Sequence, residues 1–336
     1  MDADTRKEML DTVTELVKLA IRAAESGHWD SALQQLDEAG VAYEKIPPVA
    51  DGATGKEPRY LGLGAAIAEG KGQIGLRSGK VEAGIASLET ALALRLAEEA
   101  AGGAPPPMAI PVSLVNLTGA AHSLGKADDA LAYNTRAIER LRPLDAAPSR
   151  IFLAAALEAR GNHMSQRGEH ANAKEALLES AAIAKALAAQ NMPSAAQLLT
   201  EILVAHARAA GRAGEVGDAI RLCGEAAEVS WDRFEANPQG DREAISHFVA
   251  AQMNLLGFAE QAGRFGEAED ALFKVLRLVG PDVRVIGRGK TFYETLLAMD
   301  DARLEAGNLP REEVIESYQQ LAQIAKAAAE RARPPA

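Results

Sequence analysis

Histidine and cysteine are the side chains of this sequence that could bind a metal ion or attack a substrate, and they are scattered. The six histidines show no i, i+4 pair among themselves and no HExxH or cysteine–histidine cluster, so no metal site is predicted. The single cysteine, Cys223, lies among apolar residues and is expected to be buried rather than reactive. No serine or threonine stands in the local sequence of a catalytic nucleophile. The sequence therefore predicts a protein that is not an enzyme, with no cofactor and no metal.

Two segments match parts of nucleotide-binding motifs by letter alone. Residues 70–75, GKGQIG, fit G-x-G-x-x-G, a pattern that binds a dinucleotide only between a strand and a helix. Here the glycines lie inside a segment with helical periodicity. Gly289-Lys290-Thr291 ends like a P-loop, but Arg284 stands where the first glycine is required. Nucleotide binding is not predicted. The basic cluster of Arg284, Arg288 and Lys290 is expected in a solvated loop, with an anion contact as the alternative.

The composition disfavours several classes of function. Of the 336 residues 25% are charged, and the net charge of −11 argues against non-specific binding to DNA or RNA. Charged residues interrupt every apolar window before the ~18 residues that a membrane span requires. One cysteine provides no disulfide framework, and residues 1–8 contain no apolar signal core. We therefore expect a cytoplasmic protein that binds neither nucleic acid nor membrane.

A glycine turn recurs seven times, each time between two alanine-rich amphipathic segments. Successive turns are 52, 46, 43, 46, 49 and 44 residues apart. A period of this length indicates a solenoid in which each helical hairpin buries its apolar face against the next. The turn glycines are Gly27, Gly79, Gly125, Gly168, Gly214, Gly263 and Gly307. The hairpins are predicted at 6–45, 61–100, 110–142, 150–190, 194–236, 241–279 and 289–332 of a single solenoid covering 1–336.

Small residues keep a fixed register on the second helix of each hairpin. Positions five and twelve residues after the turn glycine fall on one stripe, because they are seven residues apart. Small side chains there let neighbouring helices approach closely. The stripe contains Ala32, Gly84, Ala130, Ala173, Ala219 and Ala268 at the first position, and Ala39, Ala91, Ala137, Ser180, Ala226 and Val275 at the second. The seventh hairpin has Glu312 and Gln319 instead, which predicts a cap whose outer face meets water.

The third hairpin carries the clearest family resemblance. Residues 114–130, LVNLTGAAHSLGKADDA, resemble the first helix, the turn and the opening of the second helix of a tetratricopeptide repeat (TPR). Gly72 and Gly161 occupy the small position that this family has seven residues before the turn. The long period resembles the TPR variety of kinesin light chains and bacterial regulatory proteins. The resemblance implies an all-α, right-handed α-solenoid of about seven antiparallel helix pairs, with a concave groove lined by the first helices.

Transferring the groove positions of that family to this chain predicts ten residues that bind a partner. Amide side chains both donate and accept hydrogen bonds, which suits the main chain of an extended peptide. Arg208 and Arg212 lie four residues apart on one helix face and suit a carboxylate or a phosphate, unless Glu158 and Glu201 neutralise them. The ten residues are Gln73, Arg77, Asn116, His122, Asn162, Gln166, Arg208, Arg212, Asn254 and Gln261.

Three functions remain open from the sequence. The leading prediction is a scaffold or adaptor that binds a peptide or protein segment in the groove. The alternatives are a ligand-responsive sensor, similar to bacterial peptide receptors, and a structural subunit for self-assembly. The chaperone-binding members of the family use a lysine and an asparagine on adjacent first helices. Here the position in the second hairpin that should carry the partner of Lys18 is Gly70, so a chaperone tail is not expected. His163 and His206 are expected to pack in the core.

Overall fold

The computed structural model describes residues 2–47, 57–238 and 241–331, and this part of the chain is all-α. It contains fifteen helices and no strand, and 83% of the described residues are helical. The all-α repeat architecture predicted from the glycine turns is therefore confirmed. Among the described helices, none combines the length and the apolar character that crossing a membrane requires. The segment Ile46–Pro58, whose prolines indicate a linker between the first two hairpins, lies largely outside the described residues.

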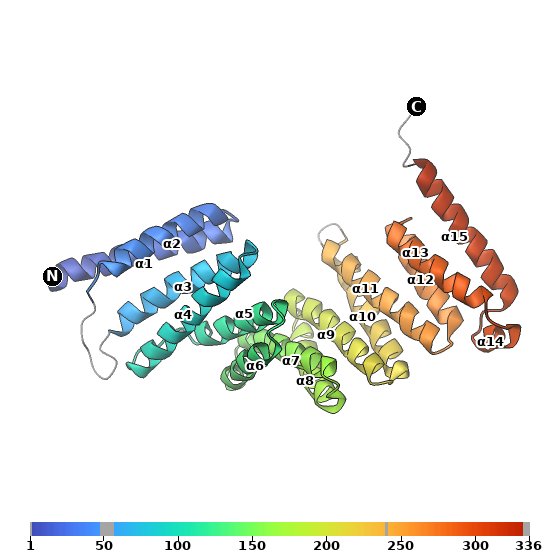
Figure 1. Cartoon of the computed structure of the whole chain (residues 1–336), viewed down its shortest axis with the longest axis horizontal. Helices are drawn as coiled ribbons and strands as arrows, with labels where there is room; N and C mark the ends of the chain where they lie inside the picture. Colours follow the sequence, from blue (N-terminus) through green and yellow to red (C-terminus); the bar gives the residue numbers. More distant parts are fainter. Residues whose placement is uncertain (1, 48–56, 239–240, 332–336) are drawn as a thin grey trace. The chain divides into compact units, whose positions relative to one another are not determined.

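The helices form two compact units, Met1–Ala156 and Leu157–Ala336, which divide within α7 (Ala147–Gln166). In the first unit α1 packs on α2, α3 on α4 and α5 on α6, and α3 also contacts α1 and α2 (Figure 1). The helices of the first unit before α7 are α1 (Ala3–Glu25), α2 (Trp29–Glu44), α3 (Pro58–Arg77), α4 (Val81–Ala100), α5 (Ala109–Ser123) and α6 (Ala127–Leu141).

The second unit repeats the same stacking of hairpins. In it α9 lies between α8 and α10, and α11 lies between α10 and α12 (Figure 1). Its helices after α7 are α8 (His170–Ala188), α9 (Pro193–Arg212), α10 (Val216–Ala236), α11 (Arg242–Gln261), α12 (Phe265–Val279), α13 (Val283–Leu297), α14 (Asp301–Ala306) and α15 (Arg311–Arg331).

Six of the predicted turns share one backbone geometry that glycine makes possible. At the first turn Gly27 has a φ of 76°, and the N–H of His28 donates to the C=O of Ala23 at 2.8 Å. This left-handed residue followed by a backward hydrogen bond is the Schellman ending of a helix. Glycine adopts the positive φ without steric cost, which explains why glycine marks each turn. The same bond closes the turns at Gly79, Gly125, Gly168, Gly214 and Gly263.

The seventh turn uses a different residue from the one predicted. Gly307 has a φ of −84°, whereas Asn308 takes the left-handed conformation with a φ of 56°. The N–H of Leu309 donates to the C=O of Leu304 at 3.0 Å, so the closing bond forms one residue later along the chain. Gly307 is required for space instead, because a Cβ there would lie 2.2 Å from a ring carbon of Phe265.

The first helix of the seventh hairpin begins earlier than the sequence indicated. The carboxylate of Asp282 accepts the N–H of Arg284 at 2.8 Å and that of Val285 at 3.2 Å, a capping arrangement that starts α13 at Val283 rather than near 289. The helix then ends at Leu297, and the short α14 leads to the turn.

The basic residues predicted in a loop lie on this helix, which corrects that expectation. Arg284 pairs with the capping Asp282, whose carboxylate is 3.6 Å away. Arg288 pairs with Glu260 of α11, and Lys290 lies 3.7 Å from Glu294 one turn along α13. Each cation therefore has a carboxylate beside it. The same helix contains the segment 289–291, so no P-loop forms there.

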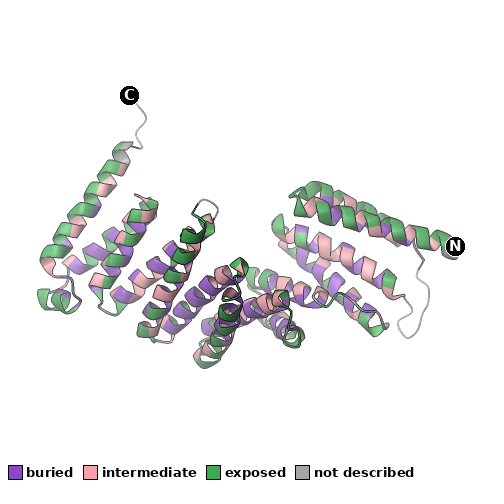
Figure 2. Cartoon of the chain, turned by 180° about the vertical axis from the view of Figure 1, so that it is seen from behind, coloured by how far each residue is buried: buried purple, intermediate pink, exposed green. Residues whose placement is uncertain are grey.

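The small stripe of the second helices is buried, as predicted. Its twelve members are all buried, and ten of them have no measurable exposed surface. Figure 2 shows buried residues running along the helix faces that meet neighbouring helices within each unit. Glu312 and Gln319 of the seventh hairpin are exposed. Close helix stacking thus depends on this stripe in the six hairpins that carry it.

The glycines of α3 and α7 serve the same close approach. A Cβ at Gly72 would lie 2.6 Å from Cγ of Leu88, and a Cβ at Gly161 would lie 2.5 Å from Cγ of Leu177. Gly70 and Gly72 both lie within α3 and not after a strand. The segment 70–75 is therefore a helix-packing surface rather than a dinucleotide fingerprint.

Candidate functional site

The ten predicted binding residues lie on the first helices of their hairpins, divided between the two units. In the first unit Gln73 and Arg77 are on α3, and Asn116 and His122 are on α5. The six others are in the second unit, on three further first helices. These are Asn162 and Gln166 on α7, Arg208 and Arg212 on α9, and Asn254 and Gln261 on α11. The three asparagines are half-buried and the other seven residues are exposed.

Two of the ten, Gln73 and Arg77, line a groove between α1 and α3, which we call the α1–α3 groove. Its volume is about 680 Å³, within the range of small-ligand and peptide pockets. Apolar side chains of both helices line it, among them Ile21, which is 53% exposed, and Ile74, which is buried. Ile21 and Trp29, which is 36% exposed, together give this groove accessible apolar surface beside its polar side chains.

An aromatic side chain holds Arg77 in this groove. The guanidinium carbon of Arg77 lies 4.6 Å from the centre of the Trp29 ring, a cation–π contact. Trp29 begins α2 and also lines the groove. In the described part of the chain, Arg77 has no carboxylate within ion-pairing distance. The groove therefore presents a positioned guanidinium with its hydrogen-bond donors available to a ligand.

A second arginine of the groove, Arg95, forms ion pairs with two carboxylates. Arg95 of α4 donates from Nη2 to Glu69 Oε2 at 3.1 Å and from Nη1 to Glu98 Oε2 at 2.9 Å. Its side chain is only 8% exposed. Burial opposes the charged form, but the two carboxylates outweigh it, so the pKa of Arg95 is raised. This cluster is part of the structure of the first unit and leaves Arg77 as the accessible cation of the groove.

Two of the predicted peptide-binding asparagines bond to their own helices. Nδ2 of Asn254 donates to the C=O of Ala250 at 2.7 Å, and Nδ2 of Asn162 donates to Glu158 Oε1 at 2.9 Å. A peptide would have to replace these bonds. Asn116 is half-buried on α5.

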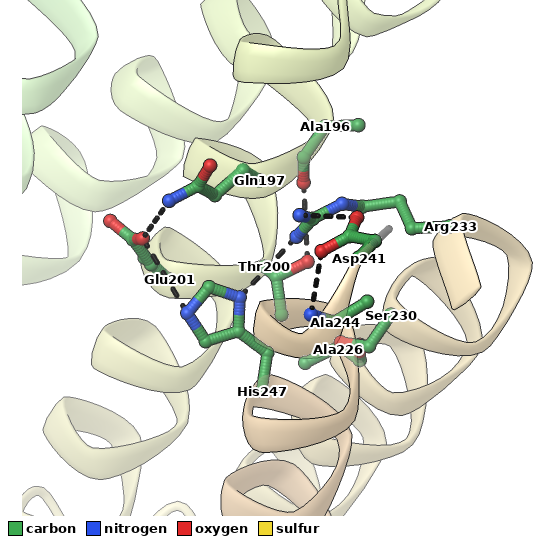
Figure 3. Close-up of polar contacts among 10 residues, drawn as sticks. All are labelled: Ala196, Gln197, Thr200, Glu201, Ala226, Ser230, Arg233, Asp241, Ala244 and His247. Atoms are coloured by element: carbon green, nitrogen blue, oxygen red, sulfur yellow. Dashed lines mark hydrogen bonds and ion pairs between the residues drawn. The ribbon is translucent and has the colours of Figure 1, made fainter. Parts of the chain in front are cut away.

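The second unit has a polar network where α9, α10 and α11 meet (Figure 3). Arg233 of α10 donates from Nη2 to Asp241 Oδ2 at 2.8 Å and contacts Nδ1 of His247 at 3.3 Å. Asp241 caps α11 by accepting the N–H of Ala244 at 2.9 Å. Nε2 of His247 lies 3.6 Å from Oε1 of Glu201 on α9. The network connects the three helices by charge rather than by apolar packing.

Three members of this region have the spacing of a metal site, which the sequence did not predict. Ligand atoms of Glu201, Glu243 and His247 lie within 4.8 Å of one another. However, the guanidinium of Arg233 can only donate, so Nδ1 of His247 accepts and Nε2 carries the proton. The nitrogen that faces Glu201 therefore has no lone pair for a metal. The arrangement is better described as an ion network than as a metal centre.

The arginine pair of α9 is only partly neutralised. Nη1 of Arg212 donates to Oγ of Ser165 at 3.2 Å. Arg208 lies near Glu158 and lowers its pKa, but burial and the charge of Glu201 have the larger effect, and the pKa of Glu158 is raised above its usual range. Glu158 therefore lies near Arg208, as one of the two alternatives from the sequence had it, but the two form no direct ion pair within the described residues.

The two histidines and the cysteine that were expected to be buried are buried. His163 and His206 are buried, and burial lowers the pKa of His206. Cys223 is fully buried, and burial raises the pKa of its thiol to about 12. A thiol with this pKa is not a nucleophile at neutral pH. His122 is exposed on α5.

Sequence reasoning missed several residues of the α1–α3 groove. Neither Trp29 nor Glu69 nor Arg95 is among the ten residues predicted to bind a partner. Only the spacing of Trp29 and Arg77, on consecutive hairpins and each two residues from a turn glycine, carried a signal. Arg95 belongs to a second helix, so no first-helix register could have found it.

Comparisons with known proteins support the fold. The family described as "Family of unknown function (DUF6483)" matches residues 220–326, less than half of the chain. No curated protein matches the chain at a significant level.

Solved structures of helical-repeat proteins resemble it along most of its length. The apo form of RapI matches with a TM-score of 0.54 and 10% identity, over 95% of this chain and 99% of that one. Aspartyl phosphate phosphatase F of Bacillus subtilis matches with a TM-score of 0.53 and 13% identity, over 96% and 94%. The C-terminal part of a TPR repeat-containing protein of Cytophaga hutchinsonii has a TM-score of 0.47 and 13% identity, over 84% and 94%. The two matches with TM-scores above 0.5 show that the chain shares the helical-repeat fold of those proteins.

Proposed function

We propose that this chain is a non-enzymatic interaction scaffold whose first unit binds a peptide segment of a partner protein in the α1–α3 groove. The observation that carries the proposal is Arg77, an accessible guanidinium held over Trp29 beside exposed apolar surface. Helical-repeat proteins typically bind partners along surfaces built from successive repeats. The sensor and self-assembly alternatives remain secondary, because no feature of the described residues favours either over simple binding.

The groove suits a segment with one acidic residue next to an apolar one. A carboxylate of the segment pairs with the two parallel N–H donors of Arg77. The exposed amide of Gln73 donates a hydrogen bond to the main chain of the bound segment and accepts one from it. The apolar side chain of the segment covers Ile21 and Ile74.

Selection from a displayed random dodecapeptide library, followed by calorimetric titration, tests the proposal. Peptides selected on the full chain are expected to contain an acidic residue. Arg77→Glu should weaken their binding by about 2–3 kcal/mol, because a charge-assisted contact is replaced by repulsion. Arg22→Glu makes the same charge change on α1 at an exposed residue outside the groove and should leave affinity unchanged.

Two results would contradict the proposal. One is equal loss of affinity in Arg77→Glu and Arg22→Glu, which would reflect net charge alone. The other is full retention of affinity in Arg77→Glu by every selected peptide, which would remove the α1–α3 groove from recognition.

A further inference from the structure

A second groove lies in the second unit, between α10 and α12 and above α11. We call it the α10–α12 groove. Its volume is about 550 Å³. The second helices α10 and α12 form its walls, and the first helix α11 provides its floor. None of the ten residues predicted from the sequence lines it, because that prediction considered first-helix positions facing the opposite side.

Aromatic surface forms one end of this groove. The rings of Trp231 and Phe248 have their centres 5.4 Å apart, and both residues line the groove. Phe248 is buried, whereas Trp231 is 36% exposed. Nε1 of Trp231 donates to Glu235 at 2.8 Å, which holds the indole in place. An aromatic pair with one accessible ring is a typical anchor for an apolar side chain of a partner.

An unsatisfied amide lies in the floor. Gln252 lines the groove and is only 5% exposed, and its Oε1 accepts no hydrogen bond within the described residues. Buried polar atoms almost always have a partner, so this oxygen at the floor of the groove is available to accept a hydrogen bond from a bound ligand. A carboxamide donates and accepts at once, which matches one peptide unit of an extended chain.

The two walls carry opposite charge. Glu228 and Asp232 lie one turn apart on α10, and Lys274 and Arg277 lie one turn apart on α12. All four are exposed, and none forms an ion pair within the described part of the chain. A ligand that crosses from one wall to the other therefore meets two carboxylates on one side and two cations on the other.

We infer that the α10–α12 groove binds an extended segment of a partner protein in which an apolar side chain lies between one basic and one acidic residue. The apolar side chain packs on Trp231 and Phe248. The peptide unit beside it pairs with Gln252. The basic residue faces α10 and the acidic residue faces α12, so that the charge pattern also determines the direction of the segment.

Gly224 offers a way to close the groove without disturbing the fold. It lines the groove within α10, and a Cβ there would have no heavy atom within 4 Å. Gly224→Leu therefore fills the groove and also replaces a poor helix former by a good one. Gly217 lies on the same helix, outside the groove, and also has free space around its Cβ. Gly217→Leu is the matched control.

The test selects a displayed random dodecapeptide library on the full chain and removes sequences that also bind Gly224→Leu. The remaining peptides are titrated against Trp29→Phe, in which Trp231 is the only tryptophan and reports directly on the groove. We expect sequences with an apolar residue between a basic and an acidic one. Gly224→Leu should weaken their binding at least tenfold, and Gly217→Leu and Arg77→Glu should leave it unchanged.

Charge reversal completes the test. The double variant Lys274→Glu, Arg277→Glu should no longer bind the selected peptides. It should bind versions of them in which lysine replaces the acidic residue. Failure to obtain any peptide that distinguishes the full chain from Gly224→Leu would overturn the inference, as would peptides without the charge pattern or equal binding to the charge-reversed variant. Loss of binding in Arg77→Glu would assign the peptides to the α1–α3 groove and overturn it as well.

Discussion

Each unit contains a cluster of charged side chains that links neighbouring helices, and the two clusters differ in the groups that they contain. In the first unit the carboxylates pair with Arg95 below the α1–α3 groove, and Arg77 stays accessible above it. In the second unit Arg233 and Glu201 both contact His247, in a network that runs from α10 through α11 to α9 (Figure 3). The first unit therefore keeps an accessible cation, Arg77, beside its cluster. In the second unit the cluster links three helices and contains a histidine.

Removing the buried arginine should produce the largest effect on stability. Arg95→Met leaves Glu69 and Glu98 without their partner, and breaking a buried pair in this way costs about 3–5 kcal/mol. The exposed Arg208→Met in the second unit should change stability by no more than about 0.5 kcal/mol.

Each unit contains one tryptophan, Trp29 or Trp231, so urea unfolding of each can be followed by fluorescence after the other is changed to phenylalanine. The loss for Arg95→Met should appear in the Trp29 signal. A loss of similar size for Arg208→Met would show that both surfaces depend on their arginines equally and would remove the contrast.

Overpacking the helix stripe should produce an intermediate effect that is the same in both units. Ala130 and Ala219 are buried at equivalent positions of α6 and α10, and leucine at either would force the stacked helices apart. We expect a loss of about 1–3 kcal/mol for each substitution. Glu312→Leu on α15 should be nearly silent, because that position is exposed. Thermal denaturation of the three variants distinguishes a shared stacking register from a general intolerance of leucine, which would lower all three melting temperatures alike.

The smallest effect should be a pH dependence of opposite sign in the two units. Burial and the charge of Glu201 raise the pKa of Glu158. The folded chain therefore holds this proton at pH values where the unfolded chain has lost it, and stability falls as pH rises through that interval. Glu158→Gln should raise the melting temperature at pH 7.5 more than at pH 4.5.

In the first unit, a hydrogen bond from Arg140 lowers the pKa of Glu99, so its contribution is present at neutral pH and lost as pH falls. Glu99→Gln should therefore lower the melting temperature slightly at pH 7.5. Shifts of the same sign for both glutamine variants would contradict the different environments of these two carboxylates.

The sequence predicted which helix carries each residue of the candidate site, but not which side chains contact one another. The resemblance to TPR proteins placed Gln73 and Arg77 on the right helix, and the structure adds the Trp29 ring that positions the guanidinium. The same register assigned Asn254 to peptide binding, although its amide already bonds to its own helix. The helix register shows on which face a side chain lies, but not whether that side chain already forms a hydrogen bond or ion pair with a neighbour.

Local backbone chemistry determined the repeat. A glycine with positive φ ends a helix through contacts within six residues, and small residues seven positions apart share one face of the next helix, so both features can be read from spacing. Tertiary structure decided the rest. The exchange of roles between Gly307 and Asn308 depends on the ring of Phe265 in the preceding hairpin. The pairing of Arg95 and the unsatisfied amide of Gln252 likewise depend on side chains from different helices. The distances between such side chains cannot be read from the spacing of residues along the sequence.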